Sequence, residues 1–315
     1  MKNIIYSLTF VVLFLMNSCA PYKNIPQIKT FQDIQYLSDV KMANLSNGVQ
    51  LAYTENGNGK ETIIFIHGLG SYIPAWNKII PELSKKYRCI AIDLPGYGKS
   101  SKDPHSGLMS YYADVVNEFA DTLGLEKFTL AGHSMGGQIA IVYGLSWPEQ
   151  INNLILFAPA GFEGFTAGQK RWLEDVMTPV LVKTSNYETI ETNLAFNFYN
   201  MPKDAEFMIT DRLAMRYADD FDNYCYAVSQ SVAGMVNEPV LDKLKNLQPR
   251  TLIFFGENDN LIPNRYLNPG ATIKIAEKGH ELIPNSKLVM IPKCGHFLMF
   301  EKPEAVIPEI IQFID

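Results

Sequence analysis

The segment Gly132-His133-Ser134-Met135-Gly136 constrains the fold of this chain more than any other stretch. A short apolar run precedes it at residues 127–130, and residues 138–145 continue as a helix until Trp147-Pro148. Glycines on both sides of a serine let a strand and a helix pass closely around a strained turn. We therefore expect Ser134 at the tip of a strand-turn-helix unit, with its hydroxyl exposed beside the helix N-terminus. The alternative is a glycine-rich packing turn without chemistry.

Apolar runs alternate with helical patterns on both sides of this turn. Predicted strands cover residues 49–54, 61–66, 87–93, 151–157, 251–255 and 286–291, and predicted helices cover residues 74–85, 110–123 and 303–313. Strands that alternate with helices at this spacing predict an α/β fold, with a doubly wound, mostly parallel sheet covered on both sides. We assign residues 42–161 and 248–315 to this core.

The alternation stops between residues 162 and 247, where no convincing strand pattern occurs. Helical periods rich in large side chains fill the segment, and they place Trp172, Val176 and Val180 on one helical face. We interpret residues 162–247 as a helical cap over the serine end of the sheet. Most of its aromatic side chains are expected to pack within the cap, and a minority to face a substrate cavity.

Composition places the chain among globular proteins and gives no support to nucleic-acid binding. Its 315 residues are 47% hydrophobic and 19% charged, and the formal net charge is −6 without a cluster of lysines or arginines. Three cysteines after the first segment, Cys89, Cys225 and Cys294, have spacings that match no metal site. We expect them to be buried small hydrophobic residues.

The first 18 residues have the pattern of a secretory signal peptide. Lys2 is followed by an uncharged apolar run, residues 4–16, which is too short to cross a bilayer comfortably. Ser18 directly before Cys19 resembles a bacterial lipoprotein signal, in which the cysteine becomes the lipidated first residue. We therefore predict an exported lipoprotein anchored to a membrane of the bacterial envelope through Cys19, with residues 19–41 as a tether. An ordinary cleaved signal with an incidental cysteine is the alternative.

An acid and a base follow the last two predicted strands. Asp259 comes after the strand at 251–255, and His296 comes after the strand at 286–291. Both therefore stand at the carboxyl ends of strands, where open α/β sheets build their sites. Glu257 is a rival acid and His280 a rival base, but His280 lacks the strand-end context and, like His105, is expected to be solvated.

Five ordered motifs together resemble the α/β-hydrolase superfamily over nearly the whole chain from about residue 51. They are His67-Gly68, residues 93–98, residues 132–136, residues 256–259 and Gly295-His296. The resemblance implies a triad of Ser134 as nucleophile, His296 as general base and Asp259 as the acid that orients it. It also implies an oxyanion hole from the backbone N–H groups of Leu69 and Met135. Neither a metal nor another cofactor is required by such a triad.

Three polar residues near these motifs are expected to play supporting parts. We interpret His67 as a structural histidine that ties down its own loop, and Asp93 as a cap for the turn that follows it. His133 is part of the serine turn, and we expect its role there to be steric.

The function predicted first is hydrolysis of carboxylic esters of small to medium apolar substrates through an acyl-enzyme on Ser134. Hydrolysis of a C–C bond in a dienoic diketone is an alternative, because Trp76-Asn77 and Arg212 or Arg216 faintly resemble such enzymes, although their Gly-Pro-Gly loop is replaced by Leu69-Gly70-Ser71. Lactonase and perhydrolase activities of the same fold are further alternatives. A binding lipoprotein that captures a ligand without turning it over is the non-enzymatic alternative.

Overall fold

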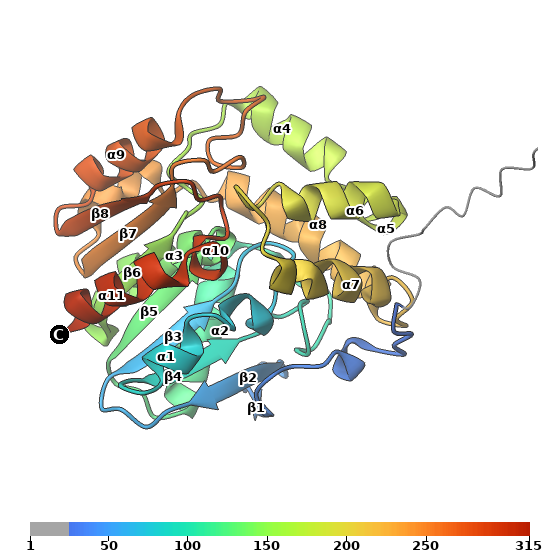
Figure 1. Cartoon of the computed structure of the whole chain (residues 1–315), viewed down its shortest axis with the longest axis horizontal. Helices are drawn as coiled ribbons and strands as arrows, with labels where there is room; N and C mark the ends of the chain where they lie inside the picture. Colours follow the sequence, from blue (N-terminus) through green and yellow to red (C-terminus); the bar gives the residue numbers. More distant parts are fainter. Residues whose placement is uncertain (1–24) are drawn as a thin grey trace, which may run out of the picture.

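One sheet of eight strands organises the computed structural model, which describes residues 25–315 (Figure 1). The strands are β1 (Val40–Asn44), β2 (Gln50–Asn56), β3 (Thr62–Ile66), β4 (Arg88–Ile92), β5 (Phe128–His133), β6 (Ile151–Phe157), β7 (Arg250–Gly256) and β8 (Ser286–Ile291). Their spatial order is β1-β2-β4-β3-β5-β6-β7-β8, and every pairing from β4 to β8 is parallel. Only two pairings are antiparallel, β1 with β2 and β2 with β4. The predicted mostly parallel α/β sheet is therefore confirmed.

The middle of the sheet is formed by strands whose side chains are buried on both faces. All five residues of β3 and all six of β5 are buried, as expected for apolar runs inside a parallel sheet. The edge strand β8 is partly exposed over most of its length. The strands that carry the predicted site residues therefore lie in the middle of the sheet and toward its β8 edge.

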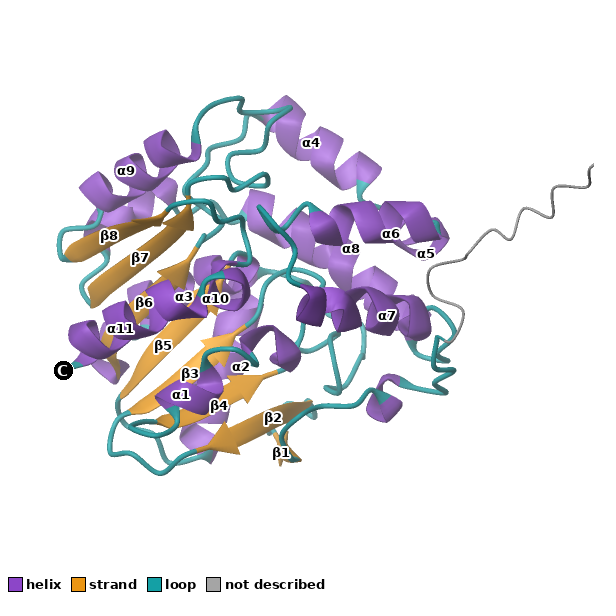
Figure 2. Cartoon of the chain, in the orientation of Figure 1, coloured by secondary structure: helices purple, strands orange, loops and turns teal. Residues whose placement is uncertain are grey.

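Helices cover both faces of the sheet. They are α1 (Ile80–Leu83), α2 (Met109–Thr122), α3 (Met135–Ser146), α9 (Thr272–Leu282), α10 (Leu298–Glu301) and α11 (Pro303–Ile314). Helix α1 packs with α11 and α2 packs with α3, and α11 crosses in front of the sheet in the view of Figure 2. The prediction of a single helix over residues 74–85 is wrong, because a 3-10 turn at Ile73–Trp76 is followed by the separate short helix α1. Proline is tolerated only in the first turn of a helix, so Pro81 requires a helix to begin close to it.

Residues 162–247 contain helices and no strand, and these helices lie together beyond one end of the sheet (Figures 1 and 2). They are α4 (Ala167–Val176), α5 (Pro179–Thr184), α6 (Tyr187–Ala195), α7 (Glu206–Met215) and α8 (Phe221–Asn237). The arrowheads of the parallel strands point toward this cap. The predicted face of Trp172, Val176 and Val180 is wrong, because the chain breaks between α4 and α5 at Thr178-Pro179 and leaves Trp172 and Val180 exposed.

Residues 25–37, called the N-terminal strap below, lie on the surface of the protein between the cap and the core. Phe31 and Ile34 are buried, Phe31 completely, and Ile25 packs against a small apolar cluster of the cap. The predicted tether over residues 19–41 is therefore wrong for its described part: residues 25–37 are packed and β1 begins at Val40. The physical reason is the spacing of Ile28, Phe31 and Ile34, which presents one apolar side to the protein.

The predicted signal peptide, residues 1–18, and Cys19 lie outside the described residues. Within residues 25–315, no helix is long and apolar enough to span a bilayer. The same residues contain no group of three or more histidine, cysteine or acidic side chains arranged to hold a metal ion. Cys89, Cys225 and Cys294 are buried, as predicted, and burial raises the pKa of the Cys89 thiol to about 12.

Candidate active site

Ser134 sits on a strained backbone between β5 and α3. Its φ of 53° and ψ of −117° lie in a region that residues with side chains rarely adopt. Hydrogen bonds hold this conformation: the Ser134 N–H donates to the carbonyl of Phe157 at 2.9 Å, and its carbonyl accepts from the N–H groups of Gly137 and Ala160 at 2.9 Å each. Such strain persists where surrounding bonds fix it, and here it exposes a serine at the end of a strand.

The glycines around Ser134 are required by close backbone approach. A Cβ on Gly132 would collide with the backbone of Gly136, and a Cβ on Gly136 would collide with the backbone of Ile66 at the end of β3. Strand β5, helix α3 and strand β3 therefore come together only because these positions lack side chains. The need for close backbone approach thus explains both the glycines of the sequence motif and the tight geometry of the turn.

Asp259 and His296 form a buried pair after β7 and β8. Nδ1 of His296 lies 2.7 Å from Oδ2 of Asp259, and the two side chains are 2% and 0% exposed, respectively. Oδ1 of Asp259 accepts from the N–H groups of Leu261 at 2.7 Å and Ile262 at 3.1 Å. The carboxylate is thus fixed by backbone donors on one oxygen and directs the imidazole with the other.

Ser134 and His296 line the same cavity, which has a volume of about 700 Å³. Cavities of several hundred cubic ångströms accommodate small organic ligands. The cap closes this space with mostly apolar side chains. These are Met177, Leu181, Val182, Ile190, Leu194, Phe196, Met208, Met215, Phe221, Val228 and Met235. Ser134 and His296 thus share one cavity, and Asp259 is connected to it through its contact with His296.

The two predicted oxyanion donors belong to segments close to Ser134. Met135 is the first residue of α3, where a backbone N–H has no partner within the helix. Residues 67–73, called the oxyanion loop below, bring Leu69 into the lining of the cavity. A Cβ on Gly68 would lie only 3.1 Å from Cβ of Ser134, so the loop can approach Ser134 this closely because residue 68 is glycine.

Two cap residues that sequence reasoning did not place at the site hold the oxyanion loop. The Arg212 guanidinium and the Tyr224 hydroxyl both donate to the carbonyl of Gly70, the tyrosine at 3.3 Å. The guanidinium carbon also lies 4.9 Å from the centre of the Tyr224 ring. Arg212 lines the cavity, and its buried Nε has no hydrogen-bond partner among the described residues. Arg212 was noted in the sequence only for a faint resemblance, because its contacts depend on the folding of the cap.

His133 does more than the steric role predicted for it. Its Nε2 donates to the backbone carbonyl of His296 at 3.1 Å, and the two rings lie 4.7 Å apart. Burial is the largest cause that holds the pKa of His133 well below its usual value, so the ring is neutral. His133, next to Ser134 in the turn, therefore helps to fix the position of the backbone at His296.

His67 and Asp93 have the structural contacts expected of them. Nδ1 of His67 donates to the carbonyl of Gly68 at 2.8 Å, Nε2 accepts from the N–H of Leu94 at 3.1 Å, and burial lowers the pKa of this imidazole to about 4. Asp93 accepts from the N–H groups of Ile73 and Lys99 at 2.8 Å each. Burial raises the pKa of the Asp93 carboxyl to about 6, although these donors oppose the shift.

The rival acid Glu257, the rival base His280 and His105 lie in different surroundings. Glu257 is exposed, while His280 lies on α9 with its Nδ1 2.7 Å from the hydroxyl of Ser286. His105 is not solvated as predicted: its ring stacks on Tyr111 and its Nε2 lies 3.1 Å from the carbonyl of Pro95. The pKa of His105 is lowered, chiefly because the ring is partly buried against Tyr111.

A model of the alpha/beta hydrolase fold family matches residues 61–303 of this chain. The chain belongs to the α/β-hydrolase fold family. The matched span of this α/β-hydrolase includes the serine turn, the cap, the acid and the base. The resemblance inferred from the five motifs is thereby confirmed at the level of the family, and the protein is a member of a family of hydrolases.

Known relatives of this α/β-hydrolase have diverse names. The dihydrolipoyllysine-residue acetyltransferase component of the acetoin cleaving system of Cupriavidus necator is 28% identical over 74% of this chain, which spans 62% of that protein's length. A 2-hydroxy-6-oxononadienedioate/2-hydroxy-6-oxononatrienedioate hydrolase of Pseudomonas putida is 26% identical over 84% of this chain and 92% of its own length. The crystal structure of a membrane phospholipase A, described as a bacterial virulence factor, matches with a TM-score of 0.71 and 27% identity, covering 88% of this chain and 86% of that one.

Proposed function

We propose that this α/β-hydrolase cleaves carboxylic esters of small to medium apolar substrates through an acyl-enzyme on Ser134. The observation that carries the proposal is one arrangement of three side chains: Ser134 on its strained turn shares a cavity with His296, whose Nδ1 is held by buried Asp259. The apolar lining from the cap favours substrates with hydrocarbon groups. The name of the related membrane phospholipase A is consistent with an ester substrate.

In this mechanism the hydroxyl oxygen of Ser134 attacks the ester carbonyl carbon while Nε2 of His296 takes the hydroxyl proton. The negative charge that develops on the carbonyl oxygen is stabilised by the N–H groups of Leu69 and Met135. Collapse of the tetrahedral intermediate breaks the bond to the alcohol, which leaves with the proton from His296. Water then attacks the acyl-enzyme, again losing its proton to His296, and the carboxylic acid is released as Ser134 regains its proton.

The test compares the wild type with Ser134→Ala in hydrolysis of a series of p-nitrophenyl esters and in labelling by a fluorophosphonate probe. The variant is expected to lose labelling and to lose kcat by about 10³-fold or more, because the covalent step requires the hydroxyl. Equal turnover by both proteins, or no turnover by either across the ester series, would contradict an esterase.

Hydrolysis of a C–C bond in an acidic dienone is the second candidate, and Arg212 is the observation that favours it. The Arg212 guanidinium lines the cavity, its buried Nε has no hydrogen-bond partner within residues 25–315, and it has the charge to pair with a substrate carboxylate. The Pseudomonas putida relative is named for dienedioate substrates, which carry two carboxylates. Loss of the absorbance of such a dienone on incubation with the wild type, and not with Ser134→Ala, would establish this activity.

We further propose that the protein is exported and anchored to a membrane of the bacterial envelope by a lipid on Cys19. The pattern of residues 1–19 supports this proposal. Replacing Cys19 by serine is expected to move the protein from the membrane fraction to the soluble fraction and to abolish incorporation of labelled fatty acid. Unchanged fractionation with unchanged labelling would contradict the anchor.

A further inference from the structure

We propose that the N-terminal strap positions the oxyanion loop for catalysis, through Phe31 and Tyr36. The inference rests on the proposed function, because it assigns the strap a part in stabilising the charge formed during acyl transfer. Neither Phe31 nor Tyr36 lines the cavity, so both act as positioning residues and not as residues that touch the substrate.

The first connection runs from Tyr36 to the far end of the oxyanion loop. The Tyr36 hydroxyl donates to Oδ2 of Asp93 at 2.6 Å, and Oδ1 of Asp93 accepts from the N–H of Ile73 at 2.8 Å. The Tyr36 ring also lies 5.8 Å from the ring of Tyr72, whose hydroxyl donates to Asp211 of the cap at 2.5 Å. The last two residues of the loop are therefore held between the strap and the cap.

The second connection runs from Phe31 to the middle of the oxyanion loop. The Phe31 ring lies 5.4 Å from the ring of Tyr224, and both side chains are buried. The Tyr224 hydroxyl donates to the carbonyl of Gly70, which follows the proposed donor Leu69 directly. Gly70 has a φ of +67°, and a Cβ there would lie 3.1 Å from the Tyr224 hydroxyl, so the tyrosine packs tightly against this turn.

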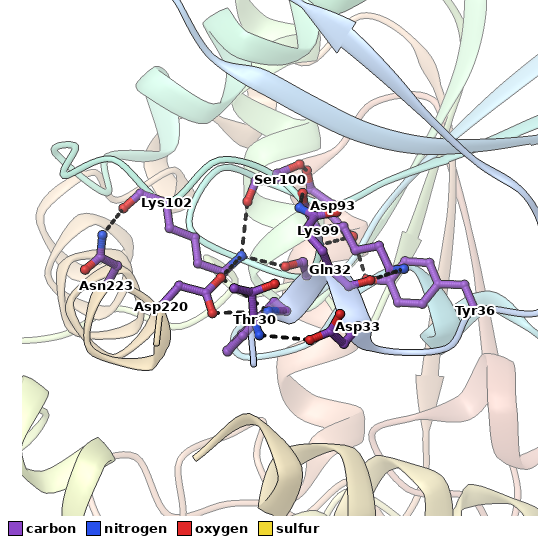
Figure 3. Close-up of polar contacts among 12 residues, drawn as sticks. Thr30, Gln32, Asp33, Tyr36, Asp93, Lys99, Ser100, Lys102, Asp220 and Asn223 are labelled. Carbon is purple, nitrogen blue, oxygen red and sulfur yellow. Dashed lines mark hydrogen bonds and ion pairs between the residues drawn. The ribbon is translucent and has the colours of Figure 1, made fainter. Parts of the chain in front are cut away.

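The strap itself is fixed by a buried cation and a carboxylate of the cap (Figure 3). The Phe31 N–H donates to Oδ1 of Asp220 at 3.1 Å, and Oδ2 of Asp220 lies 3.2 Å from Nζ of Lys102. The Lys102 side chain is 5% exposed, and its ammonium lies 4.4 Å from the centre of the Phe31 ring. Nζ also donates to the carbonyls of Gly98 at 2.7 Å and Ser100 at 3.1 Å. Strap, core and cap thus meet at one ammonium group.

These contacts have a mechanistic consequence because both connections end on the backbone that carries Leu69. Stabilisation of an oxyanion depends on donors held within a few tenths of an ångström, and small misplacements reduce the rate much more than they reduce substrate affinity. Loosening the strap is therefore expected to lower kcat while leaving KM nearly unchanged. A strap that only contributes to packing would lower stability without this separation.

Three single variants of the full chain test the proposal. Tyr36→Phe removes the hydroxyl and keeps the ring, and Phe31→Leu reduces the contact with Tyr224 while keeping the backbone donor to Asp220. Tyr87→Phe is the matched control, because Tyr87 donates to the side-chain carboxylate of Asp315 at 3.1 Å and directly precedes the amino end of β4, whereas the oxyanion loop follows the carboxyl end of the parallel strand β3.

Three measurements are compared among these proteins: kcat and KM for a p-nitrophenyl ester, affinity for a boronic acid that forms a tetrahedral adduct with serine, and amide hydrogen exchange of residues 67–73. Both strap variants are expected to lose kcat roughly three- to tenfold and boronic acid affinity by a similar factor, with KM within about twofold and faster exchange in the loop. Tyr87→Phe should lose thermal stability alone.

Exchange in the loop at the wild-type rate in both strap variants would overturn the proposal, as would faster exchange with unchanged kcat. A wild type that is inactive on every ester would overturn the proposed function instead. In that case, faster amide hydrogen exchange of residues 67–73 in the two strap variants, and not in Tyr87→Phe, would still show that the strap restrains the oxyanion loop.

Discussion

Nδ1 of His296 lies 2.7 Å from Oδ2 of Asp259, and neither side chain is appreciably exposed to solvent. The two residues are 37 positions apart in the sequence and come together because β7 and β8 are parallel neighbours whose carboxyl ends meet at one edge. Since Nδ1 is occupied by the carboxylate, Nε2 is the nitrogen that would exchange a proton with Ser134 in the proposed mechanism. The tautomer of the base is thus set by Asp259.

Replacing Asp259 by asparagine is expected to lower kcat for ester hydrolysis by about 10³- to 10⁴-fold, because an amide no longer selects the tautomer with a proton on Nδ1. The fold should be retained, since the asparagine oxygen can still accept from Leu261 and Ile262. The measurement is steady-state kinetics together with thermal unfolding. Glu257→Gln is the control, and a loss of activity in that variant in place of Asp259→Asn would reassign the acid.

Gly68→Ala should lower kcat about 10- to 100-fold, because a Cβ at this position lies 2.9 Å from Nδ1 of His133 and 3.1 Å from Cβ of Ser134 and pushes the oxyanion loop away. Gly168→Ala on α4 is the matched control: a Cβ there meets no atom within 4 Å, and alanine favours a helix. The control should keep wild-type kinetics and gain a little stability. Equal kinetics in the two variants would show that the loop tolerates a side chain at residue 68.

The stability contributed by Asp93 should depend on pH, because burial raises its carboxyl pKa from 3.8 to about 6. The folded protein binds this proton more tightly than the unfolded chain, so the contribution is fully present below about pH 4 and is lost as the pH rises through 6. The free energy of unfolding of the wild type minus that of Asp93→Asn should fall by about 3 kcal/mol over this range.

Denaturant unfolding at several pH values between 4 and 7 measures this difference. His67, whose pKa burial lowers to about 4, titrates over the same range with the opposite sign, but it is present in both proteins and cancels. A difference that stays constant with pH would mean that folding does not raise the pKa of the Asp93 carboxyl.

Arg212→Met should change the preference between acidic and neutral esters. The matched substrates are the p-nitrophenyl monoester of glutaric acid and p-nitrophenyl pentanoate, which have acyl chains of five carbons and differ in one terminal carboxylate. If the guanidinium pairs with that carboxylate, the ratio of kcat/KM for the acidic ester to that for the neutral ester should fall about tenfold or more. An unchanged ratio would limit Arg212 to its contact with the Gly70 carbonyl and favour neutral esters as substrates.

The core of the fold and the positions of Ser134, Asp259 and His296 in it were predictable because their signals are local. The serine turn is defined by five consecutive residues, and Asp259 and His296 each follow a short run with strand character, buried in β7 and partly exposed in β8. Parallel order then places all three at one edge of the sheet. The structural roles of Asp93 and His67 were predictable for the same reason, because these residues directly follow β4 and β3.

The parts that were missed depend on contacts between distant segments. Phe31 meets Asp220 across 189 positions, and Gly70 meets Arg212 across 142, so no local pattern predicts either pair. The sequence predicts a tether over residues 19–41 from their place after the predicted signal and from Pro21 and Pro26, and this prediction does not single out Phe31. Pro81 and Thr178-Pro179 did carry a local signal for helix ends, which the apolar periodicity around them outweighed in the prediction.

The contacts of the strap with the cap and the core decide where a shortened form of this enzyme can begin. A version starting at Asp39 would keep all eight strands and the three residues of the proposed triad. It would also remove the Phe31 ring from Tyr224 and from the Lys102 ammonium, and the Tyr36 hydroxyl from Asp93. Such a protein can fold and still give misleadingly low rates, so biochemical work should use a chain that begins at Ile25 or earlier.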